Sequence, residues 1–357
     1  MKVLAVKIWL AFAVVAVSSS AWAHKPTVTT FTYNHDIYPI FAAKCGACHR
    51  RGGVAPMSLL SYKEAFPWGV SIKNEVLNLA MPPWFADERY GEFKHDAGLT
   101  ATEMDTIVDW CLGGAPEGDG VAGGAFSADV SWPLGEPDVV LMMPSPVVVD
   151  ASTSEAYEEL TFATGFDGAV YLRAIDFQPS APNIVRSATI TVRLGGKEQS
   201  IASWIPGQIP ESLPEGRGRS IPAGAVVGLK IHYEKTWLDE GTAVEDQSAV
   251  ALYVYDGNPV HELQTVAASP TSPHLSATDA ELIALLPRVD DDTESLLAEL
   301  VRPDGSREPI LRLDHPSPDW PRKYWLETPL ALPSGTRVEV TVTGSEAAAV
   351  VLLDLSS

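Results

Sequence analysis

The spacing of hydrophobic residues divides the chain into two regions of different character. Up to about residue 119, apolar residues recur three or four positions apart, which predicts amphipathic helices. After Asp138, short runs of β-branched and aromatic residues lie between Gly and Pro, which predicts antiparallel strands. We therefore expect a multidomain α plus all-β fold, in which a small helical domain precedes two antiparallel, jelly-roll-like β-sandwich domains.

Two helices are predicted in the first eighty residues. Asn34 is placed to cap the first helix, whose apolar face consists of Ile37, Ile40 and Phe41. Ser61 and Glu64 have the spacing of a capping box. The second helix, which they open, is expected to bend at Pro67 and to end near Leu79.

A third helix is predicted between two clear boundary signals. Thr100 and Glu103 form a second capping box, and Gly113 ends the periodic pattern. The apolar stripe of this helix consists of Met104, Ile107, Val108, Cys111 and Leu112. We interpret Cys111 as an inert core residue on this stripe.

The strand-rich region is long enough for two sandwiches. Its first series of runs covers 139–141, 169–173, 187–192, 226–233 and 250–255. The second series covers 283–286, 295–302, 310–313, 337–343 and 350–355. A join near 256–259 gives a helical domain 24–119, a Gly- and Ser-rich linker 120–137, and sandwiches 138–258 and 259–357.

The first 23 residues have the features of a secretory signal peptide. Lys2 and Lys7 precede an apolar core at 8–17, and Ala21-Trp22-Ala23 is an A-x-A cleavage site. The apolar core is too short to span a bilayer, and no later run reaches eighteen apolar residues. We expect an exported protein of a bacterial periplasm with no membrane span. Cleavage would leave His24 as the N-terminus, but no second His is placed to complete a copper site with it.

The charge of the chain limits its partners. The formal net charge is −21, and removal of Lys2 and Lys7 with the leader takes it to −23. This argues against binding to nucleic acid or anionic lipid. It is compatible with a basic protein partner, although an acidic surface also serves solubility alone.

The strongest chemical motif is Cys45-Gly46-Ala47-Cys48-His49, a C-x-x-C-H run. Two thiols three residues apart can each add across one vinyl group of haem, and the adjacent His can ligate the iron. A disulfide or half of a zinc site is the alternative. Cys111 is the only other cysteine, so a Cys-rich metal set cannot be completed. We expect one covalent haem c.

The helical region resembles a small class I cytochrome c. A helix before the haem motif, a Met-bearing loop and a closing amphipathic helix make up that layout. The resemblance implies a Met as the sixth iron ligand. Met81, which follows a helix and precedes two prolines, is favoured over Met57, which lies only eight residues past His49. His35 and His95 are less favoured candidates for the same position, and Trp68, Trp84 and Trp110 are expected to pack around the porphyrin.

The order of segments also resembles bacterial proteins that join a cytochrome c to a copper type II, ascorbate-dependent monooxygenase module. That module is similar to the catalytic core of peptidylglycine hydroxylating monooxygenase. The haem region carries the resemblance in Ala55-Pro56-Met57-Ser58-Leu59-Leu60, Met81-Pro82-Pro83-Trp84, Asp109-Trp110 and Gly113-Gly114-Ala115-Pro116. The β region carries it in Leu213-Pro214-Glu215-Gly216, Ile221-Pro222-Ala223-Gly224, Ile231-His232-Tyr233, Pro303-Asp304-Gly305, Asp319-Trp320 and 329–336.

Most copper ligands that this resemblance implies are replaced in this chain. Where the family has a His-His pair, this chain has Arg186 and Ser187, so only His232 of the first trio remains. The His-x-His of the second site corresponds to a stretch ending in Arg288-Val289-Asp290, and no Met follows Met143. Arg cannot ligate copper, and Ser and Asp suit harder ions. Copper is therefore not expected, and Arg186, Arg288 and Asp290 are suggested to form an ion pair in the emptied cleft.

These observations leave three hypotheses. The favoured one is an exported mono-haem cytochrome that transfers electrons to a redox partner protein and is not an enzyme, its β module serving as a scaffold or docking domain. The second is a copper monooxygenase that receives electrons from its own haem. The third is a haem-based sensor or binding protein.

Overall fold

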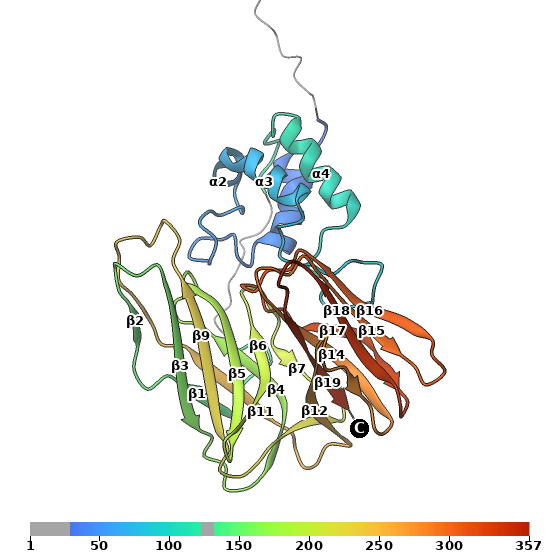
Figure 1. Ribbon diagram of the computed structural model, residues 1–357. Helices are drawn as coiled ribbons and strands as arrows, with labels where there is room; N and C mark the ends of the chain where they lie inside the picture. The colour runs from blue at the N-terminus through green and yellow to red at the C-terminus, as the bar shows by residue number, and fades with distance from the viewer. Residues whose placement is uncertain (1–28, 123–131, 357) are drawn as a thin grey trace, which may run out of the picture.

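The computed structural model describes residues 29–122 and 132–356. The predicted signal peptide, His24 and part of the predicted linker lie outside these residues. Across the described ranges, no helix is both long and apolar enough to cross a membrane. Figure 1 shows a helical part at one end of the molecule and two β-rich halves side by side beneath it, with the C-terminus in the second half.

Short helical segments build the helical part. The first run joins the π-helical turns Tyr33–Ile37 (η1) and Phe41–Cys45 (η2) through α1, Tyr38–Ile40. The second consists of α2 (Tyr62–Ala65), a 3₁₀ turn Phe66–Trp68 (η3) and α3 (Gly69–Leu77). The closing helix α4 is Ala101–Leu112. The predicted bend at Pro67 is confirmed by the 3₁₀ turn between α2 and α3.

The capping predictions had different outcomes. The capping box of α4 is confirmed, because the Thr100 hydroxyl accepts from the backbone N–H of Glu103, and the Glu103 carboxylate accepts from that of Thr100. The box predicted at Ser61 is wrong. The Ser61 hydroxyl donates to the Glu64 carboxylate, 2.6 Å away, and that carboxylate also accepts from Arg51.

Asn34 does not cap the first helical run. Tyr33 already belongs to η1, and the carboxylate of Asp36 accepts from the backbone N–H of Thr32, 2.7 Å away. The Asn34 amide instead donates to carbonyls of the loop after α4, at Gly118 and Gly120. The reason is that the helical run begins two residues earlier than predicted, with Thr32 at the N-cap position, so Asn34 contacts the loop after α4 instead of the first turn.

The prediction of a β-rich region after Asp138 is confirmed. The strands of the first half are β1 Val139–Met142, β2 Val147–Val149, β3 Glu155–Ala163, β4 Val170–Gln178, β5 Val185–Leu194, β6 Lys197–Trp204, β7 Glu211–Ser212, β8 Arg217–Ile221, β9 Val226–Glu234, β10 Val244–Asp246 and β11 Ala249–Val254. Those of the second half are β12 His261–Ala268, β13 His274–Leu275, β14 Ala280–Val289, β15 Ser295–Val301, β16 Arg307–Asp314, β17 Tyr324–Leu332, β18 Arg337–Thr343 and β19 Ala349–Ser356.

Each β half encloses its own hydrophobic core. In the first half, the sheet β3-β9-β5-β6 and the strands β1, β11 and β4 contribute to one buried cluster that includes Ile190, Leu229 and Leu252. In the second, β13-β18-β15-β16 and β12-β19-β14-β17 share a cluster that includes Leu285, Leu311 and Leu353. Alternating inward side chains thus bury one face of each strand, the usual source of stability in layered β structures.

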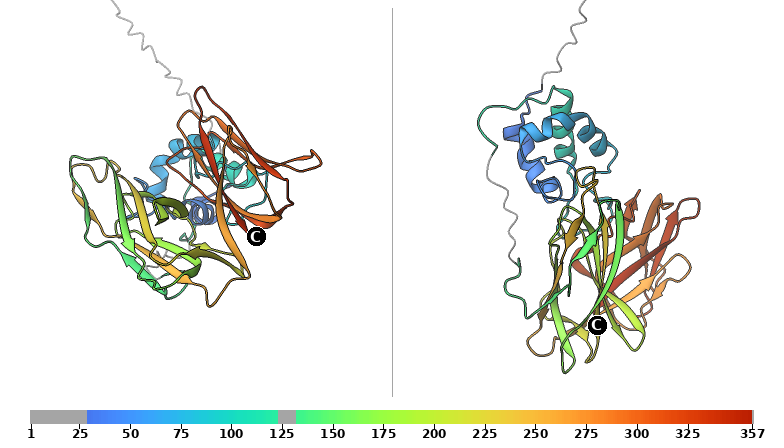
Figure 2. Two further views of the ribbon diagram at one scale, coloured as in Figure 1. Left: turned by 60° about the horizontal axis from the view of Figure 1, so that its bottom comes forward. Right: turned by 90° about the vertical axis from the view of Figure 1, so that its left-hand side faces the viewer.

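The two β halves are joined by more than the chain between them. A short parallel pairing of β8 with β12 links them into one hydrogen-bonded path of strands. A buried ionic network crosses the same boundary: Lys323 lies 2.6 Å from Glu211 and 3.0 Å from Asp354, and Arg219 lies 2.9 Å from Asp354. Figure 2 shows the two halves in contact in both views.

The segment 84–94, within the predicted helical domain, packs against the second β half. The backbone N–H of Asp87 donates to the Arg312 carbonyl at 3.0 Å, and that of Lys94 to the Trp325 carbonyl at 2.8 Å. Its side chains Trp84, Phe85, Ala86 and Phe93 pack on the core of that half. The loop that carries Met81 is therefore anchored, on its C-terminal side, to β structure.

Candidate cofactor site

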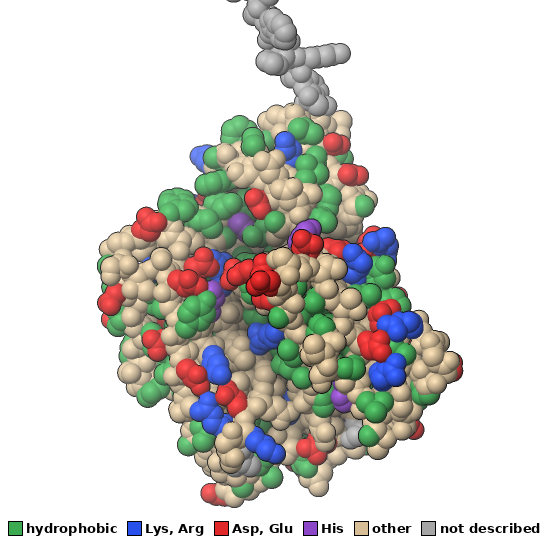
Figure 3. All heavy atoms as spheres, in the orientation of Figure 1, with side chains coloured by type: hydrophobic (Ala, Val, Ile, Leu, Met, Phe, Trp, Pro, Cys, Tyr) green, Lys and Arg blue, Asp and Glu red, His purple; other side chains and the backbone are tan. Residues whose placement is uncertain are grey.

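A large cavity lies where the helical part meets both β halves. Its volume is about 770 Å³, which falls within the range of cofactor and small-molecule sites, about 300–1,000 Å³. In Figure 3, the surface is hollowed beneath the helical part, and hydrophobic side chains gather along the upper edge of the hollow.

The structure brings the predicted site residues together around this cavity. Cys45, Cys48, His49 and Met81 line it, and so does the alternative ligand Met57. Trp68, Trp84 and His95 also line it.

Two residues weighed from the sequence do not line the cavity. Trp110 is fully buried in the helical core, where its indole N–H donates to the Pro116 carbonyl, 3.0 Å away. Its rings pack against Tyr33 and Phe41 rather than facing the cavity. His35 lies on η1 and is likewise not among the lining residues.

The C-x-x-C-H motif is held in a tight turn at the end of η2. The backbone N–H groups of Cys48 and His49 both donate to the Cys45 carbonyl, over 3.2 and 2.8 Å. This turn directly follows η2. It directs both cysteines and the imidazole to the same cavity. The N–H of Leu59 then donates to the His49 carbonyl at 2.9 Å, which fixes the loop that follows.

His49 is prepared to act as a ligand through one nitrogen. Its Nδ1 lies 3.2 Å from the backbone carbonyl oxygen of Met57. A carbonyl can only accept, so this contact assigns the proton to Nδ1 and leaves the Nε2 lone pair available. Burial lowers the pKa of His49, which favours the neutral imidazole that metal ligation requires.

Both thiols of the motif are protonated in this environment. Burial, assisted by the neighbouring Cys48, raises the pKa of Cys45 to about 12. Burial raises the pKa of Cys48 to about 11 against the opposing charges of Arg322 and Arg186. Cys111 is half-buried against the helical core, and burial raises its pKa to about 11. Neither motif thiol is in a disulfide, and no three His, Cys, Asp or Glu side chains within the described ranges are arranged to hold a bare metal ion.

The β halves contribute lining residues that the sequence did not indicate. The loop 206–210 of the first half and the segment 320–325 of the second both reach the cavity. The Sγ of Cys48 lies 3.7 Å from the Pro206 carbonyl oxygen. Gly207, at φ +79°, lies so close to Ala47 that a Cβ at this position would be 2.6 Å from the Ala47 Cβ. Only glycine therefore fits against the haem motif here.

The positions at which the resemblance implied copper ligands make other contacts in the structure. Ser187 on β5 is the direct cross-strand partner of His232 on β9. The His232 Nε2 lies 2.9 Å from the Glu155 carboxylate, and its ring stacks on Tyr157 with centroids 4.4 Å apart. His232 thus has a hydrogen-bond partner and a stacking partner from β3, which account for its position without a metal.

The ion pair suggested for Arg186, Arg288 and Asp290 is wrong. Arg186 instead pairs with Glu234, 2.6 Å away on the neighbouring strand. Arg288 donates to the Thr189 hydroxyl across the boundary between the halves, and Asp290 accepts from the Thr293 hydroxyl in its own turn. Each group finds a nearer partner, so none is left to pair across the cleft.

Comparisons with known proteins do not assign a family. No family model and no curated protein matches this chain. Among solved structures, the STIV MCP is 11% identical and covers 60% of this chain and 95% of its own, with a TM-score of 0.27. The major capsid protein P2 from bacteriophage PM2 is 11% identical over 61% of this chain and 96% of its own, with a TM-score of 0.24. The PBSX exported protein XepA is 10% identical over 62% and 87%, with a TM-score of 0.19. Likenesses at this level carry no information on function.

Proposed function

We propose that this protein is an exported c-type cytochrome that carries one covalent haem and transfers single electrons. The observation that carries the proposal is the convergence of Cys45, Cys48, His49 and Met81 on one cavity of about 770 Å³. The hydrogen bond of His49 Nδ1 to a carbonyl supports the assignment, because it orients the other ring nitrogen for a metal.

Each residue has a distinct role in this proposal. Cys45 and Cys48 would hold haem through thioether bonds, and His49 would be the axial iron ligand through Nε2. Haem bound there would supply one-electron chemistry by alternating between its ferric and ferrous states. Trp68, Trp84 and the β loop 206–210 line the same cavity and would keep water from the group. A dry, apolar surrounding disfavours the ferric state, whose charge is greater, and so raises the reduction potential.

Met81 is proposed as the second axial ligand in preference to Met57. The backbone carbonyl of Met57 accepts a hydrogen bond from the His49 ring, so the Met57 backbone lies next to the proposed ligand His49. Met81 lies three residues before Trp84, in the loop that the second β half anchors. That anchoring would hold the Met81 thioether at the cavity.

We further propose that the β halves are two antiparallel, jelly-roll-like β-sandwiches of a monooxygenase-like module that has lost its copper chemistry. The residues at the positions where the resemblance implies copper ligands support this, because they are paired with carboxylates. Arg186 is paired with Glu234, and His232 with Glu155. The module would act as a scaffold for the haem site. The acidic chain would suit a basic redox partner outside the cytoplasm, as in the periplasm.

Spectroelectrochemistry of the full chain tests the electron-transfer function. Reversible reduction with a low-spin, six-coordinate spectrum in both oxidation states is expected, together with slow binding of CO to the ferrous form. Rapid CO binding would indicate an open distal position and favour a sensor instead. Failure of the reduced form to reoxidise with a one-electron acceptor would also count against the proposal.

A further inference from the structure

Arg322 is a partly buried cation that has no carboxylate partner within the described residues. It precedes β17 and lines the cofactor cavity. Its Nε donates to the Pro83 carbonyl at 3.2 Å, and its guanidinium lies over the Trp84 ring, 5.3 Å from the centroid. Within the described residues, Arg322 forms no ion pair, and its two terminal nitrogens have no hydrogen-bond partner.

Other buried cations of the same boundary are paired with carboxylates. Lys323, the next residue, contacts both Glu211 and Asp354, and Arg219 contacts Asp354. Burial of an uncompensated cation costs several kcal/mol. Burial accordingly lowers the pKa of Arg322, against smaller opposing effects of Tyr324, Cys48 and Asp96. The structure therefore places a partly buried cation without a carboxylate partner at the wall of the cavity.

The position of Arg322 relative to the haem motif identifies that partner. Arg322 and Cys48 line the same cavity. A haem attached at Cys45 and Cys48 brings two propionate carboxylates into the same cavity. With Nε occupied by Pro83, the two terminal nitrogens of Arg322 remain for a bidentate contact with a carboxylate.

We propose that Arg322, from the second β half, binds a haem propionate and thereby sets the reduction potential of the haem. This inference rests on the proposed function. The electron added on reduction is stabilised by a nearby cation, so Arg322 raises the potential. The β structure thus takes part in the redox chemistry rather than only supporting it.

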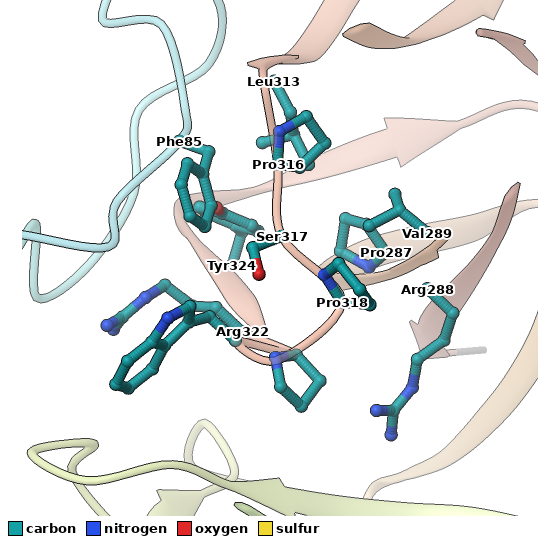
Figure 4. Close-up of a pocket in the computed structure, with 12 residues that line it drawn as sticks. Phe85, Pro287, Arg288, Val289, Leu313, Pro316, Ser317, Pro318, Arg322 and Tyr324 are labelled. Carbon is teal, nitrogen blue, oxygen red and sulfur yellow. The ribbon is translucent and has the colours of Figure 1, made fainter. Parts of the chain in front are cut away.

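Arg288 provides a matched control within the same region. It is also a partly buried arginine, but it donates to Thr189 and lines a smaller cavity of about 40 Å³ instead of the cofactor cavity. Figure 4 shows the Arg288 and Arg322 side chains on different sides of this smaller cavity, which both residues line. Lys94 lines the cofactor cavity without a side-chain partner among the described residues, so it is a competing cation.

The test is the midpoint potential of the haem-loaded full chain and four variants. Arg322→Gln is expected to lower the equilibrium constant for reduction about tenfold, a midpoint lowered by about 59 mV for a one-electron couple. Arg322→Lys, which keeps the charge, is expected to restore most of that difference. Arg288→Gln and Lys94→Gln are expected to match the unaltered protein. An unchanged potential in Arg322→Gln, or an equal shift in either control, overturns the inference.

A measurement on the unaltered protein covers the case in which Arg322→Gln does not fold. Redox-induced infrared difference spectra, with ¹³C at the propionate carboxylates, are expected to show an ionised carboxylate down to about pH 5. A carboxylic acid band at that pH overturns the inference. If the chain carries covalent haem but the potential or the infrared spectra contradict the prediction, only the role of Arg322 is refuted. If the chain attaches no haem, the proposed function itself is refuted.

Discussion

The Sγ atom of Cys48 lies 3.7 Å from the backbone carbonyl oxygen of Pro206, 158 residues further along the chain. This contact joins the C-x-x-C-H motif to the first β half. The segment 84–94 makes the corresponding junction with the second half through backbone hydrogen bonds at Arg312 and Trp325. The cofactor cavity is therefore a product of all three parts of the molecule.

Substitution of Met81 tests the assignment of the second axial ligand. Met81→Ala removes the only thioether proposed for that position, so the ferric Met–iron charge-transfer band is expected to disappear and the midpoint potential to fall. Absorption spectra in the near infrared measure the band directly.

Met57→Ala is the matched control for Met81→Ala. The hydrogen bond to His49 comes from the Met57 backbone, so it survives this substitution, and the band is expected to persist. Loss of the band in Met57→Ala, with retention in Met81→Ala, would reverse the ligand assignment.

Trp84 tests the anchoring of the Met-bearing loop to the second β half. Its ring lies 5.1 Å from Tyr324 and 6.3 Å from Phe93, centroid to centroid. Trp84→Ala is expected to lower the free energy of unfolding by about 2–4 kcal/mol, because it leaves a void at this packing site. The loosened loop should also accelerate CO binding to the ferrous haem, measured by flash photolysis.

Trp237, which is 57% exposed, is the matched control for Trp84. Trp237→Ala is expected to change the free energy of unfolding by no more than about 0.5 kcal/mol and to leave CO binding unchanged. Equal CO rates in Trp84→Ala and the unaltered protein would show that the loop does not depend on this anchor.

Asp176 on β4 predicts a dependence of stability on pH. Burial raises its pKa from 3.8 to about 6, against a hydrogen bond from the Phe177 N–H, and its Oδ2 has no hydrogen-bond partner among the described residues. The folded state therefore holds this proton more tightly than the unfolded state. Its contribution to stability is present below about pH 4 and is lost as the pH rises to about 6.

Asp176→Asn removes this ionisation, so it should stabilise the protein only at pH values above about 6, the raised pKa of Asp176. The expected gain is about 1–2 kcal/mol at about pH 7.5, after allowance for solvent screening, and close to zero at about pH 4. Urea unfolding at the two pH values measures it. A gain of the same size at both would mean that ionisation is not the cause.

Arg219 tests the buried network between the β halves. Arg219→Met leaves Asp354 with Lys323 as its only cation and is expected to lower the free energy of unfolding by about 3 kcal/mol. The control is Arg307→Met, which removes exposed pairs with Glu299 and Glu339 and should cost at most about 1 kcal/mol. Similar losses in urea unfolding for the two variants would contradict the account.

The sequence predicted those features that depend on local patterns. The capping box at Thr100, the break at Pro67 and the β-rich character after Asp138 follow from spacing and residue type. The convergence of Cys45, Cys48 and His49 was also expected, because they are adjacent in the chain. These features need no knowledge of distant contacts.

The remaining features depend on long-range packing. Ser61 matches a capping box, but Arg51 competes for the Glu64 carboxylate, and spacing alone does not reveal that competition. Nothing in the local pattern places Arg322 near Cys48, since they are brought together only when the second half docks on the helical part. The misassigned partner of Arg186 has the same origin, because Glu234 becomes its neighbour only through the pairing of β5 with β9.

Quantitation of haem, iron and copper in the purified full chain tests the central claim most directly. The account predicts one covalent c-type haem and one iron per chain, no stoichiometric copper, and no haem when Cys45 and Cys48 are both replaced by Ala. A chain without covalent haem whose Cys45 and Cys48 react as free thiols after unfolding would contradict it. So would stoichiometric copper that is lost in His232→Ala, which would indicate an oxygenase.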